Sequence, residues 1–274
     1  MDIDQEGEIL ESGESEGSQI ILPGEALPGL VSVLPLDLRP FFPGQAIPLV
    51  KDAELWLPTL QAVQERKQDV IGLIATKKDG IEQPAPGDLY TMGTMCRIHR
   101  VHREGSQIQI LLEGLQRFSV RQWLSDTAPL MANARYYPDR SEVRKEAQTE
   151  EQKAYAVAII NTIKELIPLN PLYGEELKVF LARSDINEPS MLADFAASLT
   201  SASKEDLQQV LETVSLQRRM EKVVELLHRE LKIAQAQMEI REHVEQEIQG
   251  HQREAILKQQ LKFIQQELGI AKDD

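Results

Sequence analysis

Apolar residues recur with two different periods along this chain of 274 residues. Between residues 30 and 137 they form short runs, or alternate with polar residues, and Pro and Gly separate the runs, which is typical of β-strands. The predicted strands cover 31–36, 45–50, 70–75, 92–101, 107–120 and 130–137. One stretch, 52–67, has helical spacing instead, with Asp52 as its N-cap. Several strands, one helix and short turns predict a small, closed or strongly curved sheet.

The apolar period becomes helical after residue 139. An apolar stripe between Tyr155 and Leu166 predicts a helix that ends before Pro168. Further helices are predicted at 174–182 and 188–199, and the segment from Ser203 to Asp206 fits a capping box for another short one. The expected fold class is therefore α+β, with an N-terminal β-rich lobe followed by an α-helical bundle.

The chain is predicted to end in one very long helix. The span from Ser215 to Leu268 contains no Pro and only Gly250 as a weak helix former. At 1.5 Å per residue this helix would be roughly 80 Å long. A compact body made from the preceding ~200 residues would be only about 40 Å across. Part of the helix should therefore project into solvent or onto a partner.

Apolar positions divide this helix into two packing zones. A stripe from Leu216 to Ala234 can pack on the bundle, and the stripe thins between 235 and 250. It returns with the 4-3-4 spacing of a coiled-coil seam. We expect pairing contacts at Met238, Ile248, Leu257, Leu261, Ile264 and Leu268. Gly250 marks a place where the rod could bend.

Charge is unevenly distributed along the chain. The formal net charge is −14, and residues 1–19 hold seven acidic residues with no Lys or Arg. This composition predicts a disordered tail, with an acidic interaction arm as the alternative, and argues against secretory and mitochondrial leaders. No apolar run approaches the ~20 residues that cross a bilayer, so we expect a soluble chain without membrane contact. The single Cys96 excludes a disulfide framework and favours a reduced, cytoplasmic setting.

The domains expected from these patterns are four. They are a disordered acidic tail at 1–27, a β-rich lobe at 28–138, a helical bundle at 139–214 and a long connecting helix at 215–274.

Motifs for nucleotide, metal or nucleophilic chemistry are absent from the sequence. It contains no GxxxxGK[ST] and no GxGxxG, and its single GxSxG string, at 13–17, lies in the acidic tail rather than at a strand-to-helix elbow. Its five His lack an HExxH context, and basic residues on the long helix are balanced by acidic ones. We therefore expect no catalytic residue, no cofactor or metal site and no nucleic-acid site in this chain.

Aromatic residues are the remaining candidates for function. The segment Pro40-Phe-Phe-Pro-Gly44 reads either as a core plug beneath the sheet or as an exposed apolar patch that grips apolar segments of another protein. Trp123 and the pair Tyr136-Tyr137 leave the same two readings open. The candidate protein contacts are Phe41, Phe42, Pro43, Trp123, Tyr136 and Tyr137.

Four segments carry a resemblance to a known family. LPLDLRPFFPGQAIPL (34–49) resembles the opening of the N-terminal domain of Lon proteases, as do PGDLYTMGTMCRI (86–98) and LLEGLQRF (111–118). REAILKQQLKFIQQELG (253–269) is the fourth, and all four occur in the family's order. Asp37 stands where an Arg often follows in the family, and the residues before Leu27 have no counterpart.

The resemblance implies a fold and a role. Lon enzymes are homo-oligomeric, usually hexameric, ATP-dependent serine proteases of protein quality control. Their N-terminal region combines a β-rich lobe, similar to PUA-like folds, with a helical bundle and a long helix. It recognises unfolded, damaged or tagged proteins, called clients below, and supports the ring. ATP and Mg belong to an AAA+ module and catalysis to a peptidase module, and neither maps onto these residues, so the chain is expected to be a piece of such an enzyme.

Two rival functions remain open at this stage. One is a stand-alone module that reads a ligand or a degron without any protease, and the other is a coiled-coil scaffold assembled through the long helix. The gene beyond Asp274 would decide the first, and deletion of residues 235–274 would decide the second.

Overall fold

Six β-strands make up the first region of the computed structural model, which describes residues 27–138, 149–170, 173–178 and 188–268. The strands are β1 (Leu30–Leu36), β2 (Ala46–Asp52), β3 (Val70–Ala75), β4 (Met92–Glu104), β5 (Gln107–Trp123) and β6 (Leu130–Tyr137). A 3-10 turn, η1 (Pro86–Asp88), precedes β4. Apolar residues dominate β3, which is buried along its whole length, as expected for a strand at the centre of a sheet.

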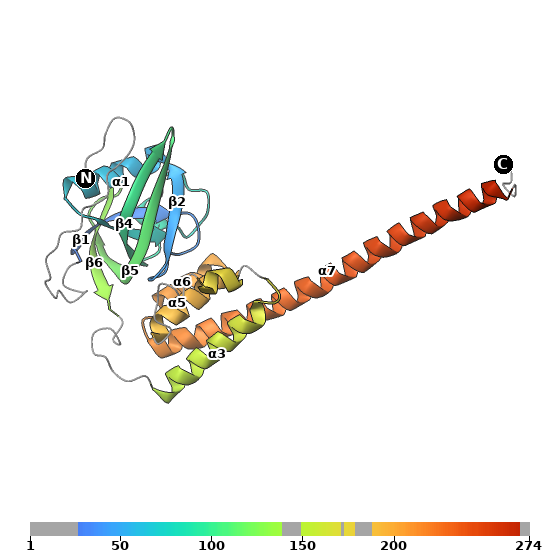
Figure 1. Cartoon of the computed structure of the whole chain (residues 1–274). Helices are drawn as coiled ribbons and strands as arrows, with labels where there is room; N and C mark the ends of the chain where they lie inside the picture. The colour runs from blue at the N-terminus through green and yellow to red at the C-terminus, as the bar shows by residue number, and fades with distance from the viewer. Residues whose placement is uncertain (1–26, 139–148, 171–172, 179–187, 269–274) are drawn as a thin grey trace.

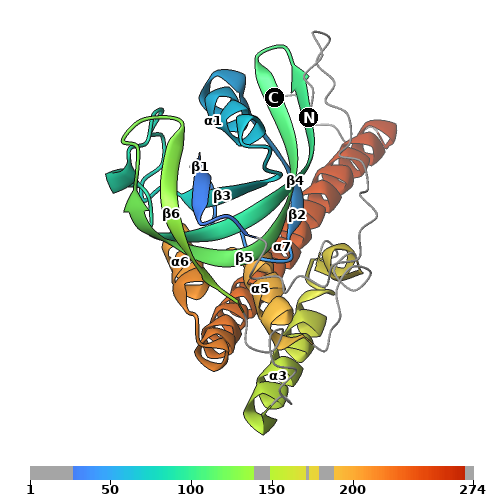
Figure 2. The ribbon, with the colours of Figure 1, turned by 90° about the vertical axis from the view of Figure 1, so that its left-hand side faces the viewer.

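Pairing closes five of these strands into a barrel. The order is β2-β5-β4-β3-β1-β6, and β6 returns to pair with β5. The long β5 makes this possible, because its first half pairs with β2 (Leu49 opposite Ile110) and its second half with β6 (Phe118 opposite Tyr136). Figure 2 shows the strands curving around their core. Among the described strands, β2 alone is paired on one side only along its whole length.

The helix α1 (Ala53–Glu65) covers part of the barrel core. Asp52 caps it, and its side chain accepts a hydrogen bond from the backbone N–H of Glu54 at 2.9 Å. Trp56 and Val63 of α1 are buried with Leu34, Ile71 and other strand residues in one apolar cluster. A second cluster, which includes Val33, Met95 and Phe118, fills the other part of the barrel.

Helices α3 (Glu150–Leu166), α5 (Pro189–Leu199), α6 (Lys204–Glu212) and the start of α7 (Leu216–Glu267) form a bundle beside the barrel. Thr149 begins α3 with a capping box, and Ser203 caps α6 by accepting from the N–H of Asp206. The bundle core contains Ile159, Ile163, Leu192, Leu207, Met220 and Leu227. In both ribbon views the bundle lies below the barrel, with α5 and α6 nearest to it.

The helix α7 is 52 residues long and leaves the bundle partway along its length. Its buried residues run from Arg219 to Glu230, and beyond residue 234 every described side chain is exposed. Figure 1 shows its C-terminal half extending far beyond the other helices. The helix continues without a break through Gly250.

The α+β fold class expected from sequence is confirmed, with a β-rich lobe, a helical bundle and a very long last helix. The strand expected at 130–137 and the helix starting after Ser215 are found as predicted. The hairpin of β4 and β5 is longer than expected, because the polar residues 102–104 continue the ladder opposite 107–109. The acidic tail, apart from Leu27, and the start of the bundle at 139–148 lie outside the described residues.

Candidate functional site

Two adjacent rings, Phe41 and Phe42, enter different cores. Phe41 belongs to the barrel cluster around Leu34 and Trp56, whereas Phe42 belongs to the bundle cluster around Leu192 and Leu207. They are 5% and 1% exposed, respectively. The reading of this pair as an exposed patch is therefore corrected: the rings pack, because consecutive side chains of an extended segment point in opposite directions. Phe42 thereby joins the barrel to the bundle.

The loop that carries these rings is fixed by its backbone against β5. Gly44 adopts φ 77° and its N–H donates to the carbonyl of Gly114 at 2.8 Å, while the N–H of Gly114 donates to the carbonyl of Gln45 at 2.8 Å. A Cβ on Gly114 would lie 2.4 Å from the carbonyl oxygen of Phe42, so the loop can approach this closely only because residue 114 is glycine. The side chain of Gln45 accepts from the N–H of Phe42 at 2.8 Å.

A buried ion pair holds the barrel against the bundle. Arg117 of β5 donates from Nη1 to Oδ2 of Asp194 of α5 at 2.7 Å, and from Nε to the carbonyl of Leu211 at 3.0 Å. Arg219 of α7 lies on the other side, with Nε 3.6 Å from Oδ1 of Asp194. A further bond joins Nε2 of Gln208 to the carbonyl of Met92 at 2.9 Å. These contacts fix one arrangement of the two regions.

An apolar groove of about 280 Å³ opens at this junction, beside β2. Ile47 and Leu49 of β2 line it, together with Leu36 and the loop residues 38–42. Leu207 and Ser198 of the bundle also line the groove. Three large apolar side chains on or near β2 are exposed, namely Leu38, Ile47 and Val50. The groove therefore offers apolar surface that is continuous with the barrel core.

A second hollow, of about 210 Å³, lies by Pro43 and Gly44 of the same loop. Tyr137, Met191 and Glu113 line it, together with the buried Arg117 and Asp194. Its lining is more polar, and its two most buried charged groups already bond to each other. The half-buried Pro43 and Tyr137 thus meet here, whereas the apolar groove beside β2 contains neither.

The other aromatic candidates are half-buried in the barrel wall. Trp123 and Tyr136 pack against the cluster around Phe118, and the hydroxyl of Tyr136 donates to the carbonyl of Pro28 at 2.6 Å. Burial raises the pKa of Tyr136 above its ordinary range. The guanidinium carbon of Arg135 lies over the Tyr137 ring, 5.2 Å from the ring centroid. These residues do not gather into one surface with Phe41 and Phe42, and their contact with clients stays a prediction.

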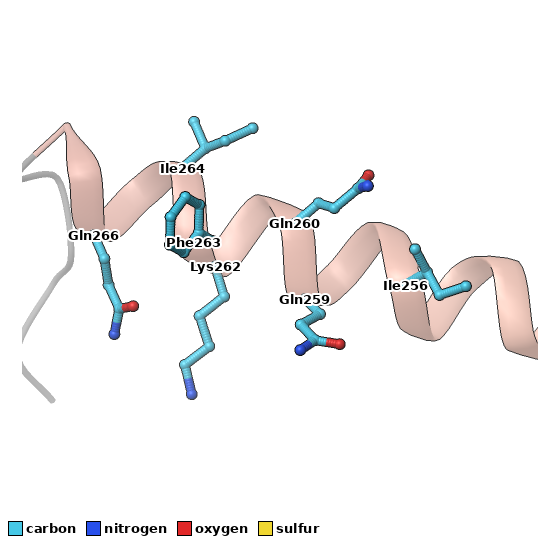
Figure 3. Close-up of a pocket in the computed structure, with 7 residues that line it drawn as sticks. All are labelled: Ile256, Gln259, Gln260, Lys262, Phe263, Ile264 and Gln266. Atoms are coloured by element: carbon cyan, nitrogen blue, oxygen red, sulfur yellow. The ribbon is translucent and has the colours of Figure 1, made fainter.

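The end of α7 carries the largest group of exposed apolar side chains in the described chain. Each member is more than half exposed: Ile256, Leu257, Leu261, Phe263, Ile264 and Leu268. Figure 3 shows Ile264 on one side of the helix, and Lys262 and Gln266 on the other. Met238 and Ile248, also expected in the seam, are exposed nearer the bundle. The helix is thus amphipathic where nothing described covers it.

A buried carboxylate fixes the direction in which α7 leaves the bundle. Glu230, only 6% exposed, accepts hydrogen bonds from the N–H and hydroxyl of Ser201, at 2.7 Å and 2.6 Å, and from the hydroxyl of Tyr173 at 2.7 Å. Burial, with the hydrogen bond to Glu230, raises the pKa of Tyr173. Three donors on one carboxylate hold α7 against the end of α5 just before the rod becomes exposed.

The described residues contain neither a metal-binding cluster nor a helix that could span a membrane. In those ranges no three or more His, Cys, Asp and Glu side chains gather closely enough to hold a metal ion. None of the described helices has a stretch sufficiently long and apolar to span a bilayer.

The charged members of the junction were not anticipated from sequence. Arg117 gave one signal, because it is a lone cation within the mostly apolar run of residues 108–120. Its partner Asp194 lies 77 residues further along the chain, a separation that no local pattern connects. The open edge of β2 also depends on the strand order, which no local sequence pattern gives.

Comparison with protein families gives a match over residues 31–229 to the family described as "ATP-dependent protease La (LON) substrate-binding domain". Among curated proteins, the chain is 42% identical over 261 residues to Lon protease 2 of Hydrogenovibrio crunogenus, covering 95% of this chain and 29% of that protein. It is 40% identical over 252 residues to Lon protease of Magnetococcus marinus, covering 91% and 31%. The chain thus spans less than a third of these relatives.

Solved structures give the same fold. The N-terminal domain of the Mycobacterium avium complex Lon protease superposes with a TM-score of 0.53 at 21% identity, covering 73% of this chain and 98% of that one. A Lon N-terminal domain protein from Xanthomonas campestris gives 0.51 at 16% identity, covering 71% and 96%.

Proposed function

Because this chain belongs to the Lon protease family, we propose that it recognises protein clients and positions them for the proteolytic part of a longer ATP-dependent enzyme. The clients would be unfolded, damaged or degron-bearing proteins, and the setting cytoplasmic. The observation that carries the proposal is the apolar groove between β2 and the loop that follows β1. Folded proteins bury their apolar segments, so an accessible apolar groove favours unfolded ones.

The amphipathic end of α7 supports a second part of the proposal, which is assembly. Apolar side chains at 257, 261, 264 and 268 follow the 4-3-4 spacing of a coiled-coil seam, and all four are exposed. Copies joined in a ring, hexameric as the resemblance implies, would present several weak client sites together. Linked sites raise the effective concentration of one another and so the overall avidity.

Client binding is tested with the full chain and fluorescein-labelled, reduced and carboxymethylated α-lactalbumin, which stays unfolded. We expect saturable binding by fluorescence anisotropy, and at least tenfold weaker binding of native α-lactalbumin. Equal affinities for the two forms would overturn client recognition.

Assembly is tested by sedimentation equilibrium of the full chain. The triple variant Leu257→Asp, Leu261→Asp, Ile264→Asp should lose self-association, since it places three charges in the seam. The matched variant Lys262→Asp, Gln266→Asp changes the opposite side of the same helix and should keep it. Identical masses for both variants would overturn the assembly role.

Two other functions make distinguishable predictions. A coiled-coil scaffold would lose its only activity when residues 235–274 are removed, whereas a client-binding region would still bind unfolded α-lactalbumin. A stand-alone ligand- or degron-binding module would come from a gene without ATPase and peptidase segments downstream. The family match over 31–229 favours client recognition over both.

A further inference from the structure

The outer edge of β2 is open along the whole strand. Residues 46–52 pair with β5 on one side, and no described strand pairs on the other. Backbone N–H and C=O groups at such an edge can accept another extended chain. The other strands form the closed ring, except that β4 beyond Ile98 has β5 as its only strand partner.

The two open edges differ in chemistry. The free part of β4 carries the exposed residues Arg100, His102, Arg103 and Glu104, and charged side chains on an edge discourage strand addition. On β2, Ile47 is 40% exposed and Val50 is 51% exposed. Lys51, the cation of β2, forms an ion pair with Asp37. The edge of β2 is therefore the apolar one.

The groove beside β2 has the spacing that an extended chain requires. Ile47 and Leu49 are two residues apart, so both side chains lie on the same face of the strand, and both line the groove. Leu36 and Phe41, which also line the groove, belong to the barrel core. A chain paired along β2 would direct every second side chain to this face.

We propose that an extended apolar segment of an unfolded client adds to the sheet as a strand along β2 and inserts alternate side chains into the groove beside Ile47 and Leu49. This inference rests on the proposed client recognition and specifies its mode. Backbone pairing is independent of sequence, and the groove selects apolar side chains, so many different clients are accepted. Folded proteins are rejected because their strands are already paired.

Pro48 limits the strength of this pairing. Proline has no N–H, so β2 offers one donor fewer than a full edge strand. Binding to one copy is therefore weak and reversible, which suits a region that must release its client to a protease and avoid permanent aggregation.

The test uses the full chain and a fluorescein-labelled peptide, Thr-Val-Thr-Val-Thr-Val-Thr. Two twins carry N-methyl groups, one on every Val and the other on every Thr. Each twin loses the backbone donors along one edge but keeps its side chains. We expect one twin to bind at least tenfold more weakly than the parent peptide, and the other to bind like it. Amides of residues 46–52 should gain hydrogen-exchange protection with the parent peptide.

Substitutions locate the site. Ile47→Asp should weaken binding of the parent peptide at least tenfold, and the milder Ile47→Thr, which keeps strand propensity, should weaken it severalfold. Val157→Asp is the matched control, since Val157 is 56% exposed on α3, away from the groove, and it should leave binding unchanged.

Several results would overturn the inference. If both methylated twins bind like the parent while Ile47→Asp weakens all three, clients use the groove without strand addition, and the proposed function survives. If neither the peptide nor unfolded α-lactalbumin binds, client recognition itself fails. If the peptide binds only after deletion of residues 1–26, the edge belongs to the chain's own beginning. If Ile47→Asp abolishes self-association without changing peptide affinity, the edge belongs to a second copy.

Discussion

Arg117 and Asp194 form a two-pronged ion pair buried between β5 and α5, in which both Nη atoms of the guanidinium donate to the carboxylate. The two side chains are 2% and 1% exposed. Arg219 approaches the same carboxylate from α7. Among the described residues, Asp194 is thus the carboxylate that both guanidinium groups share at the point where strand, bundle and long helix meet.

The sharing of one carboxylate predicts different costs for removing Asp194 and for removing Arg117. Asp194→Asn removes the carboxylate that the two buried guanidinium groups share and should lower the free energy of unfolding by about 3–5 kcal/mol. Arg117→Met leaves Asp194 beside Arg219 and fills the space with an apolar chain, so its cost should be smaller, about 1–3 kcal/mol. Urea unfolding at pH 7 measures both. A larger loss for Arg117→Met would contradict this account.

An exposed ion pair provides the control for that comparison. Lys178 and Glu175 are 73% and 70% exposed at 2.7 Å. Lys178→Met should change the free energy of unfolding by less than about 0.5 kcal/mol, because water screens such pairs.

Phe42 predicts coupling between the two regions. Its ring packs in the bundle core, yet both Trp residues, Trp56 and Trp123, lie in the barrel region. Phe42→Ala should cost about 3–5 kcal/mol, as large-to-small core changes do. If barrel and bundle unfold together, the free energy of unfolding obtained from Trp fluorescence should fall by the same amount, and the urea midpoint should fall with it. An unchanged Trp midpoint would show that the barrel unfolds separately. Phe263→Ala, at a position 63% exposed, should leave it unchanged.

The half-buried Tyr136 predicts a loss of stability in alkali. Burial raises the pKa of Tyr136, so the folded state keeps its proton at a pH where the unfolded chain, with an ordinary pKa of about 10, releases it. The stabilisation is fully present below that ordinary value and is lost as pH rises from it towards the folded pKa. Tyr136→Phe should therefore flatten the fall in free energy of unfolding between about pH 9 and 11. An unchanged slope would contradict the burial of this hydroxyl.

The sequence predicted well those strands and helices that are marked by residues within or next to them. Gly29 precedes the run that became β1, and Pro129 and Pro138 flank the run that became β6. The absence of breakers after Ser215 predicted α7. The polar arms of the β4–β5 hairpin were missed at 102–104, because their pairing partners, and no apolar pattern, make them strands.

The candidate site was less accessible to sequence reasoning because it depends on distant pairs. The sequence allowed Phe41 and Phe42 to be either core residues or an exposed apolar patch. They pack in two different cores because their loop lies closely against Gly114, which the sequence did not reveal. The groove beside β2 requires the strand order, in which β5 joins β2, β4 and β6. The apolar seam of α7 could be predicted because helical spacing is a local property of the sequence. The partner that packs against this seam stays a prediction.

Gly250 predicts a local gain in helix stability when it is replaced by Ala. A Cβ at this position meets nothing within 4 Å, and the residue lies inside α7, so only the conformational freedom of the unfolded chain changes. Gly250→Ala should stabilise the surrounding turns by about 0.5–1 kcal/mol. Amide exchange of residues 246–256 should slow about two- to fivefold, the same free energy expressed as a rate ratio. Gly105→Ala is the matched control: its Cβ also meets nothing, but its φ of 59° strains any side chain. That variant should destabilise the β4–β5 hairpin, and stabilisation at both positions would contradict the argument.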